Sequence, residues 1–247
     1  MGSLVASLSD GTLTLLEPDQ TGQLVITSAW TAHAHEPWCV AWNYHDTNVI
    51  YSGAGVSYTF FLNQYLLTSC YKEETTSSSR CGTYGKVLSS RSSPTKGMFA
   101  HNRVHSVIVE RVFRFDAGVT CIQSHPNLEH LIAAGSYDAT VRIFDTRKPL
   151  KPLSQADVGG GAWRVKWHPS PSRSLDLLVA AMHDGFKIMR FHASDANGGN
   201  WETLKEHNEH NSLAYGVDWS HKSSQDHGET LAASASFYDH ALHLWRG

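Results

Sequence analysis

A repeating unit constrains this chain more than any other feature of its sequence. Each copy has the same order: an alternating apolar strand, a turn, a buried apolar strand, a turn that contains aspartate, and a closing strand. Clear copies begin at Val119, Trp163 and Tyr215, which are 44 and 52 residues apart. Units of about 40 to 45 residues built from short strands are typical of propeller blades.

The repeat therefore predicts an all-β fold, a WD-repeat β-propeller. A weaker copy begins near Trp38, and residues 4–16 resemble the second half of a blade whose first strand is missing. About four to five blades are recognisable, whereas WD-repeat propellers usually have about seven. We expect a ring that is incomplete at the N-terminus, with strand edges left exposed.

One stretch, residues 56–112, carries no repeat signal. It is rich in Ser and Thr around residues 73–80 and 89–95, which favours a loop or disorder. Two interpretations stay open: a degenerate blade, or an insertion such as a translated intron. We therefore expect residues 1–247 to form a single propeller domain that contains this irregular segment.

Charge and composition exclude several classes of protein. The chain has 20 Lys and Arg against 23 Asp and Glu, and no run of like charges of the kind that binds nucleic acid. It has no apolar run of the roughly 20 residues that cross a membrane, and no signal-peptide pattern. Its 4 cysteines are widely spaced, which favours a reducing compartment. We expect a cytoplasmic protein without nucleic-acid or membrane partners.

Four motifs are more specific than generic repeats. They are GGAWRVKWHP (160–169), AMHDGF (181–186), SLAYGVDW (212–219) and SFYDHALHLW (236–245). In these motifs the chain resembles the diphthine methyl ester hydrolase family. The members of this family are WD-repeat proteins of the diphthamide pathway, and older naming calls them diphthine methyltransferase-like. The resemblance covers residues 1–55 and 113–247, and the match departs from the family in residues 56–112.

The resemblance implies an activity, a partner and a compartment. It implies a cytosolic carboxylic ester hydrolase that removes the methyl ester of diphthine methyl ester, releasing methanol before a final amidation. The implied partner is elongation factor 2, which carries the modified histidine. No cofactor is expected.

Strand order predicts which loops meet. Because antiparallel strands alternate in direction, the loop entering a first strand and the turn between the second and third strands lie at the same end of a blade. The His-Pro turns at His125 and His168 fall on the opposite face, and we interpret them as structural. The shared face gathers Trp38, Tyr137, Asp138, Trp163, His183, Asp184, His207, His210, Ser212, Tyr215, Tyr238, Asp239 and His240.

Aromatic residues on this face are candidates for substrate binding. The resemblance implies a methyl ester next to a trimethylammonium group, and aromatic faces hold such a cation with about 0.5 to 2 kcal/mol each. The alternative is that these rings simply pack between neighbouring blades. The candidates for a cage are Trp163, Tyr215, Tyr238 and Trp38.

Ester hydrolysis needs an activated nucleophile, a proton shuttle and stabilisation of the oxyanion. The chain has no G-x-S-x-G elbow, so a histidine that activates water is the favoured mechanism. His183 and His240 are the candidates, with Asp184 or Asp239 to orient an imidazole. Ser212 is a second choice as nucleophile. The alternative is that these turn residues only bond local backbone.

Sixteen histidines raise the question of a metal. The pairs His33-x-His35, His101-x-x-x-His105 and His207-x-x-His210 have usable spacings, but none is joined by a third ligand at recognisable spacing. The sequence therefore predicts no metal site.

A non-catalytic scaffold is the competing function, because WD propellers are more often binding platforms than enzymes. Residues Phe144, Asp145 and Arg147 resemble the box by which some WD proteins dock onto ubiquitin-ligase adaptors. The alternative interpretation is therefore a scaffold or a substrate adaptor of a ubiquitin ligase. This alternative does not explain the histidines on the aromatic face.

Overall fold

The computed structural model describes residues 2–55, 60–67, 106–113, 115–148, 151–193, 199–221 and 228–247. Side chains are described in all of these except 60–67 and 106–113. The described part of the chain is almost entirely β, with 18 strands in five antiparallel sheets and one short 3-10 helix. Among its described residues no helix is long and apolar enough to span a membrane.

The sheets follow one another along the chain. The first contains β1 (Leu4–Ser7), β2 (Thr12–Pro18) and β3 (Leu24–Thr31). The second contains β4 (Pro37–Trp42), β5 (Val49–Ala54), β6 (Phe60–Leu67) and β7 (Ser106–Phe113). The third contains β8 (Val119–Ser124), β9 (Leu131–Ser136), β10 (Thr140–Asp145) and β11 (Ser154–Asp157).

The remaining two sheets complete the series. The fourth contains β12 (Arg164–Trp167), β13 (Asp176–Ala180), β14 (Phe186–His192) and β15 (Asn200–His207), with the 3-10 helix η1 (Pro171–Arg173) between its first two strands. The fifth contains β16 (Ala214–Trp219), β17 (Leu231–Ser236) and β18 (Leu242–Arg246). Every sheet is an up-and-down meander.

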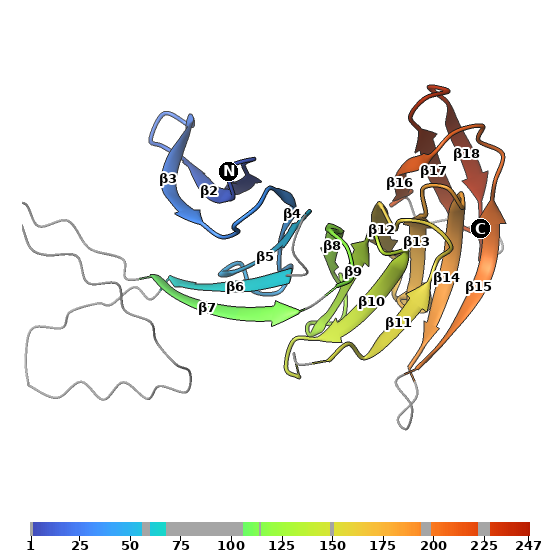
Figure 1. Ribbon diagram of the computed structural model, residues 1–247, viewed down its shortest axis with the longest axis horizontal. Coiled ribbons are helices and arrows are strands. Elements are labelled where there is room, and N and C mark those ends of the chain that lie inside the picture. The colour runs from blue at the N-terminus through green and yellow to red at the C-terminus, as the bar shows by residue number, and fades with distance from the viewer. Residues whose placement is uncertain are drawn as a thin grey trace, which may run out of the picture.

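The five sheets are arranged as an open arc. Strand β4 contacts both β1 and β8, and β12 contacts both β8 and β16, so successive sheets pack through their first strands. Figure 1 shows the sheets fanning out from the N-terminal sheet in blue to the C-terminal sheet in red, which lie apart at the open side. The all-β WD-repeat fold is confirmed, and in the described residues the ring of sheets does not close.

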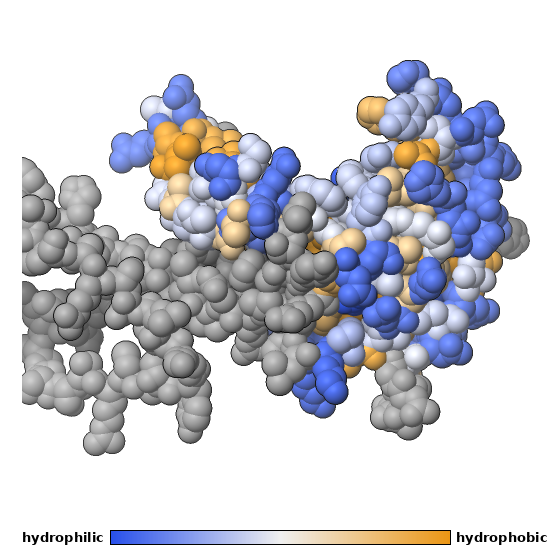
Figure 2. Space-filling view, viewed as in Figure 1, coloured by the Kyte–Doolittle hydropathy of each residue, from blue (hydrophilic) through white to orange (hydrophobic). Residues whose placement is uncertain are grey.

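The open side exposes apolar side chains. On β3, Leu24, Val25 and Ile26 are 47%, 41% and 67% exposed. Figure 2 shows the corresponding hydrophobic patch on the first sheet, whereas hydrophilic residues follow the outer margin of the fourth and fifth sheets. In a closed propeller both faces of every sheet pack against neighbours, whereas in the described residues the first sheet packs only against the second.

Part of the irregular stretch 56–112 forms strands. Strands β6 and β7 pair from Phe60 opposite Phe113 to Leu67 opposite Ser106, as the third and fourth strands of the second sheet. Residues 56–59 and 68–105 lie outside the described part of the chain. The single-domain assignment of 1–247, and the choice between a degenerate blade and an insertion, stay predictions.

Apolar strand residues fill the spaces between sheets. Between the third and fourth sheets, Val141, Ile143, Leu177 and Val179 are fully buried. Burying a side chain of this size contributes about 1.5 to 3 kcal/mol. The β-branched residues favour the extended backbone, so the same positions specify both the strands and the core.

Histidines that follow the first strands connect the second sheet to the third, the third to the fourth and the fourth to the fifth. His45 Nε2 lies 2.9 Å from the carbonyl oxygen of His125, and His125 Nε2 lies 2.7 Å from that of Ser174. His168 Nε2 lies 2.7 Å from Thr230 Oγ1. Burial lowers the pKa of His125, and lowers that of His168 to about 4. The structural interpretation of the His-Pro turns is confirmed.

Candidate functional site

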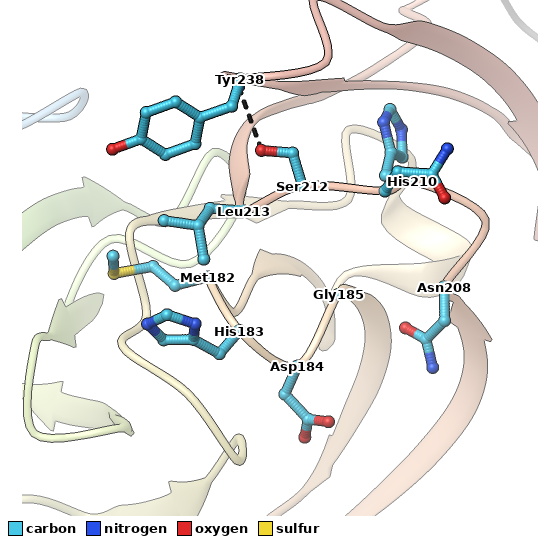
Figure 3. Close-up of a pocket in the computed structure, with 10 residues that line it drawn as sticks. Met182, His183, Asp184, Gly185, Asn208, His210, Ser212, Leu213 and Tyr238 are labelled. Carbon is cyan, nitrogen blue, oxygen red and sulfur yellow. Dashed lines mark hydrogen bonds between the residues drawn. The ribbon is translucent and has the colours of Figure 1, made fainter.

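A groove of about 680 Å³ opens where the fourth and fifth sheets meet. Its walls are the β13–β14 turn and the loop from β15 to β16, with one residue from the β17–β18 turn (Figure 3). The structure brings together at this groove four of the predicted site residues: His183, Asp184, Ser212 and Tyr238.

The β13–β14 turn has an unusual backbone. Met182 is buried, yet its φ is 38°, in the left-handed region that residues other than glycine rarely adopt. Its carbonyl accepts a hydrogen bond of 2.9 Å from the Ala214 N–H, which joins the two walls of the groove. Strained backbone of this kind gathers at functional sites. Here it places His183, an exposed residue, on the groove wall.

Asp184 is held by a lysine. Its Oδ2 accepts a hydrogen bond of 2.6 Å from Lys187 Nζ, and Lys187 also lies 3.6 Å from Glu206. Within the described residues no histidine contacts the Asp184 carboxylate. Its role in orienting an imidazole stays a prediction, and the ion pair with Lys187 is its structural role.

Asp239 stabilises its own turn. Its carboxylate accepts hydrogen bonds from the N–H groups of Asn211 and Ala241 at 3.0 and 3.2 Å, and from the Ser236 hydroxyl. These bonds, that of Ser236 foremost, lower its pKa. His240 lies next to it on the turn, exposed and with a φ of 53°, and does not line the groove. The catalytic roles of Asp239 and His240 stay predictions.

Ser212 faces the groove with its hydroxyl proton available. Its Oγ accepts a hydrogen bond of 3.0 Å from the Tyr238 N–H, drawn as a dashed line in Figure 3. Within the described residues, no histidine nitrogen contacts this oxygen, so the base that would activate a serine nucleophile is not beside it. The hydroxyl can instead donate to an oxygen in the groove.

Six aromatic rings form a continuous row that ends at the groove. The row connects the inner ends of the second to fifth sheets, with centroid distances of 4.9 to 6.3 Å between successive rings. It contains every predicted substrate-binding residue. In order, the rings are those of Tyr137, Trp38, Trp163, Tyr215, Phe237 and Tyr238.

Several rings of the row are exposed to solvent, where a ligand can contact them. Trp38 is 40% exposed and Tyr238 is 68% exposed, while Trp163 and Tyr215 between them are half-buried. A Cβ at Gly55 would lie 2.1 Å from the Trp38 indole, so only glycine leaves room for this ring. Packing between blades thus accounts for the central rings, and their exposed faces remain free for binding.

Sequence reasoning placed Tyr137 on this face without naming it as a substrate-binding residue, and it missed Phe237. Both lie in second turns, one or two residues before the turn aspartate, which is the same place that Tyr238 occupies. An aromatic residue at that position was the signal that could have found them.

Sequence reasoning also missed a third histidine next to His207 and His210. His243, from β18, places its Nδ1 3.1 Å from His207 Nε2, and its ring stacks on that of His210 at 3.9 Å. Burial lowers the pKa of both His207 and His210. No spacing rule could reveal this partner, because it comes from a strand that begins more than 30 residues later.

The first of the other two histidine pairs with ligand-like spacing is not brought together. His33 is buried and its Nε2 lies 2.8 Å from Ser52 Oγ, whereas His35 is exposed. His101 and His105 lie outside the described residues.

The residues predicted to contact a ligase adaptor have structural partners. Phe144 and Asp145 are buried, and the exposed Arg147 donates two hydrogen bonds, of 2.9 and 2.7 Å, to the Asp145 carboxylate. These contacts close the blade. Adaptor binding through them stays a prediction.

Comparison with known proteins agrees with this fold. Residues 109–145 match the family described as WD domain, G-beta repeat. A diphthine methyltransferase homolog from Dictyostelium discoideum is 31% identical over 249 residues, covering 98% of this chain and 59% of the relative. The diphthine methyltransferases of Mus musculus and Homo sapiens are each 34% identical over 218 residues, which is 88% of this chain but 37% and 39% of those proteins.

This chain therefore spans about three fifths or less of the length of the curated relatives that it matches. The similarity extends over nearly all of the chain, including the sheets that build the groove. This chain is therefore similar over most of its length to proteins named diphthine methyltransferase, and residues 109–145 match a WD domain.

Proposed function

We propose that this protein hydrolyses the methyl ester of diphthine methyl ester on elongation factor 2, as a step of diphthamide biosynthesis. The names of its relatives connect them with the methylation of diphthine. The observation that carries the proposal is the aromatic row that ends at Tyr238, on the rim of a groove lined by His183 and Ser212.

The aromatic row supplies the binding step. A trimethylammonium group lacks hydrogen-bond donors, so ring faces are the groups that hold it best. With this cation against Tyr215 and Tyr238, the ester next to it reaches the groove, since Tyr238 belongs to both the row and the groove. Binding to the rings thereby positions the ester for reaction.

The groove supplies the chemical step. His183 accepts a proton from a water molecule as the water oxygen attacks the ester carbonyl carbon. The Ser212 hydroxyl donates a hydrogen bond to the oxyanion that forms. The C–O bond to the methoxy group then breaks, and the imidazolium returns its proton to the leaving group, which departs as methanol. The carboxylic acid that forms loses its proton to solvent and becomes a carboxylate, and no cofactor is consumed.

Mass spectrometry of elongation factor 2 tests the proposal directly. The factor is isolated from cells that lack this gene and is incubated with the purified chain. We expect accumulated methyl ester that loses one methyl group, with methanol released. If the ester accumulates in the cells but persists after incubation, this chain is not sufficient as the hydrolase. If no ester accumulates, the scaffold interpretation replaces the proposal.

Replacing Trp163 with leucine tests the aromatic row. Trp163 contacts both Trp38 and Tyr215, and loss of its ring face removes one cation–π contact while apolar volume remains. We expect KM for a trimethylammonium substrate to rise about 10-fold, with kcat changed much less. Steady-state kinetics measures this, and Tyr44→Leu, at an exposed tyrosine away from the row, is the control. An equal rise in both variants would show that the row does not bind the cation.

A further inference from the structure

Three histidines from different elements converge beside the groove. His207 ends β15, His210 lies in the following loop and lines the groove, and His243 comes from β18. One nitrogen of each ring lies within 4.8 Å of one nitrogen of each other ring. The proposed ester hydrolysis does not use any of these three imidazoles.

We propose that this histidine trio binds a divalent transition metal, with Zn²⁺ as the ion that fits it best. A tetrahedral Zn²⁺ with Zn–N bonds of about 2.0 to 2.1 Å holds two ligand nitrogens about 3.3 Å apart. His207 Nε2 and His243 Nδ1 are already 3.1 Å apart. A donor set made only of imidazoles selects Zn²⁺ and its neighbours over Mg²⁺ or Ca²⁺, which prefer oxygen.

Aromatic neighbours hold the rings in place. The His207 ring stacks on Trp245 with a centroid distance of 4.8 Å and an interplanar angle of 12°. The His210 ring lies 4.9 Å from that of Phe186. These contacts restrict the His207 and His210 rings, so little of their side-chain entropy is lost when an ion binds. The His243 ring, which stacks on that of His210, must tilt so that both rings aim a nitrogen at the ion.

The contacts of His210 show what metal binding must change. Its Nδ1 lies 2.5 Å from Ser236 Oγ and its Nε2 lies 2.8 Å from Ser234 Oγ. A metal-binding imidazole needs one free nitrogen and usually bonds through the other. Nε2 therefore exchanges Ser234 for the ion, while Ser234 keeps its hydrogen bond of 3.1 Å from Trp245 Nε1. The hydrogen bond between His210 Nδ1 and Ser236 remains. The Ser236 hydroxyl also bonds the Asp239 carboxylate, so His210 stays connected to Asp239.

Three protein ligands leave one position of a tetrahedral ion for water. His210 is also one of the residues that line the groove, together with His183 and Ser212.

Metal titration tests the proposal without any measurement of activity. The chain is purified without a histidine tag, stripped with a chelator and titrated with Zn²⁺ in competition with a chromophoric chelator. We expect saturation at one Zn²⁺ per chain, and tetrahedral absorption bands when Co²⁺ replaces Zn²⁺. His243→Gln is expected to weaken binding by about 100-fold or more, whereas His35→Gln, at an exposed histidine of the first half of the chain, leaves it unchanged.

Thermal unfolding separates loss of the ligand from loss of the fold. In a chelator, wild type and His243→Gln are expected to melt at nearly the same temperature. Added Zn²⁺ then raises Tm for wild type alone, because an ion that binds only the folded state stabilises it. Equal Zn²⁺ binding by the two proteins, binding that does not saturate, or purely octahedral Co²⁺ spectra would each overturn the proposal. Failure of the purified chain to cleave the ester would not contradict the metal-binding proposal.

Discussion

Replacing His183 with alanine is expected to lower kcat for ester cleavage by about 100- to 10,000-fold, the range that general acid–base catalysis supplies. His183 is the histidine that the turn beyond β13 places on the groove wall, next to the strained backbone of Met182. His240 does not line the groove. The loss is therefore expected from His183→Ala alone, and adding His240→Ala is expected to change it little.

The measurement is methanol release from the methyl ester at saturating substrate, together with Tm of each variant. His183 is exposed, so its removal leaves the core intact and Tm within about a degree of wild type. His221→Ala, at an exposed histidine away from the groove, is the matched control. Turnover by the double variant that equals the wild-type rate would remove both histidines from the mechanism.

The inner strands could be predicted from the sequence and the outer strands could not. Strands β8, β12 and β16 begin within one residue of the expected positions, because each opens a copy of the repeat and buries apolar side chains. The outer strands β11 and β15 bury little: the segment NWETLKEH of β15 is mostly exposed. Their position comes from pairing with a preceding strand, which leaves almost no apolar signal.

The candidate site could be predicted as a face but not as a set of contacts. Strand direction alone placed His183, Ser212 and Tyr238 at one end of the blades, and the groove contains all three. The pairing of Asp184 with Lys187, and of Asp239 with Ser236, depends on side-chain packing within single turns. Residue type and spacing leave those pairings open, since a turn carboxylate can bond a lysine, a serine or backbone with similar ease.

Acid is expected to destabilise this protein well before its carboxylates are protonated. Burial lowers the pKa of His33 and of His168 to about 4, from the ordinary value of 6.5. A histidine whose pKa falls on folding binds its proton more readily in the unfolded chain, so it favours folding fully only above pH 6.5. As the pH falls from 6.5 towards 4, each of the two removes about 1.4 kcal/mol of stability per pH unit. Urea unfolding at several pH values measures this slope.

The variant His168→Gln isolates one of these contributions. The glutamine amide can still bond Thr230, whose Oγ1 lies 2.7 Å from His168 Nε2, but it cannot be protonated. Its unfolding free energy is expected to depend less steeply on pH, by about 1.4 kcal/mol per unit between pH 6.5 and 4. The matched control is His221→Gln, at an exposed histidine. An unchanged slope in His168→Gln would contradict the lowered pKa of His168 in the folded chain.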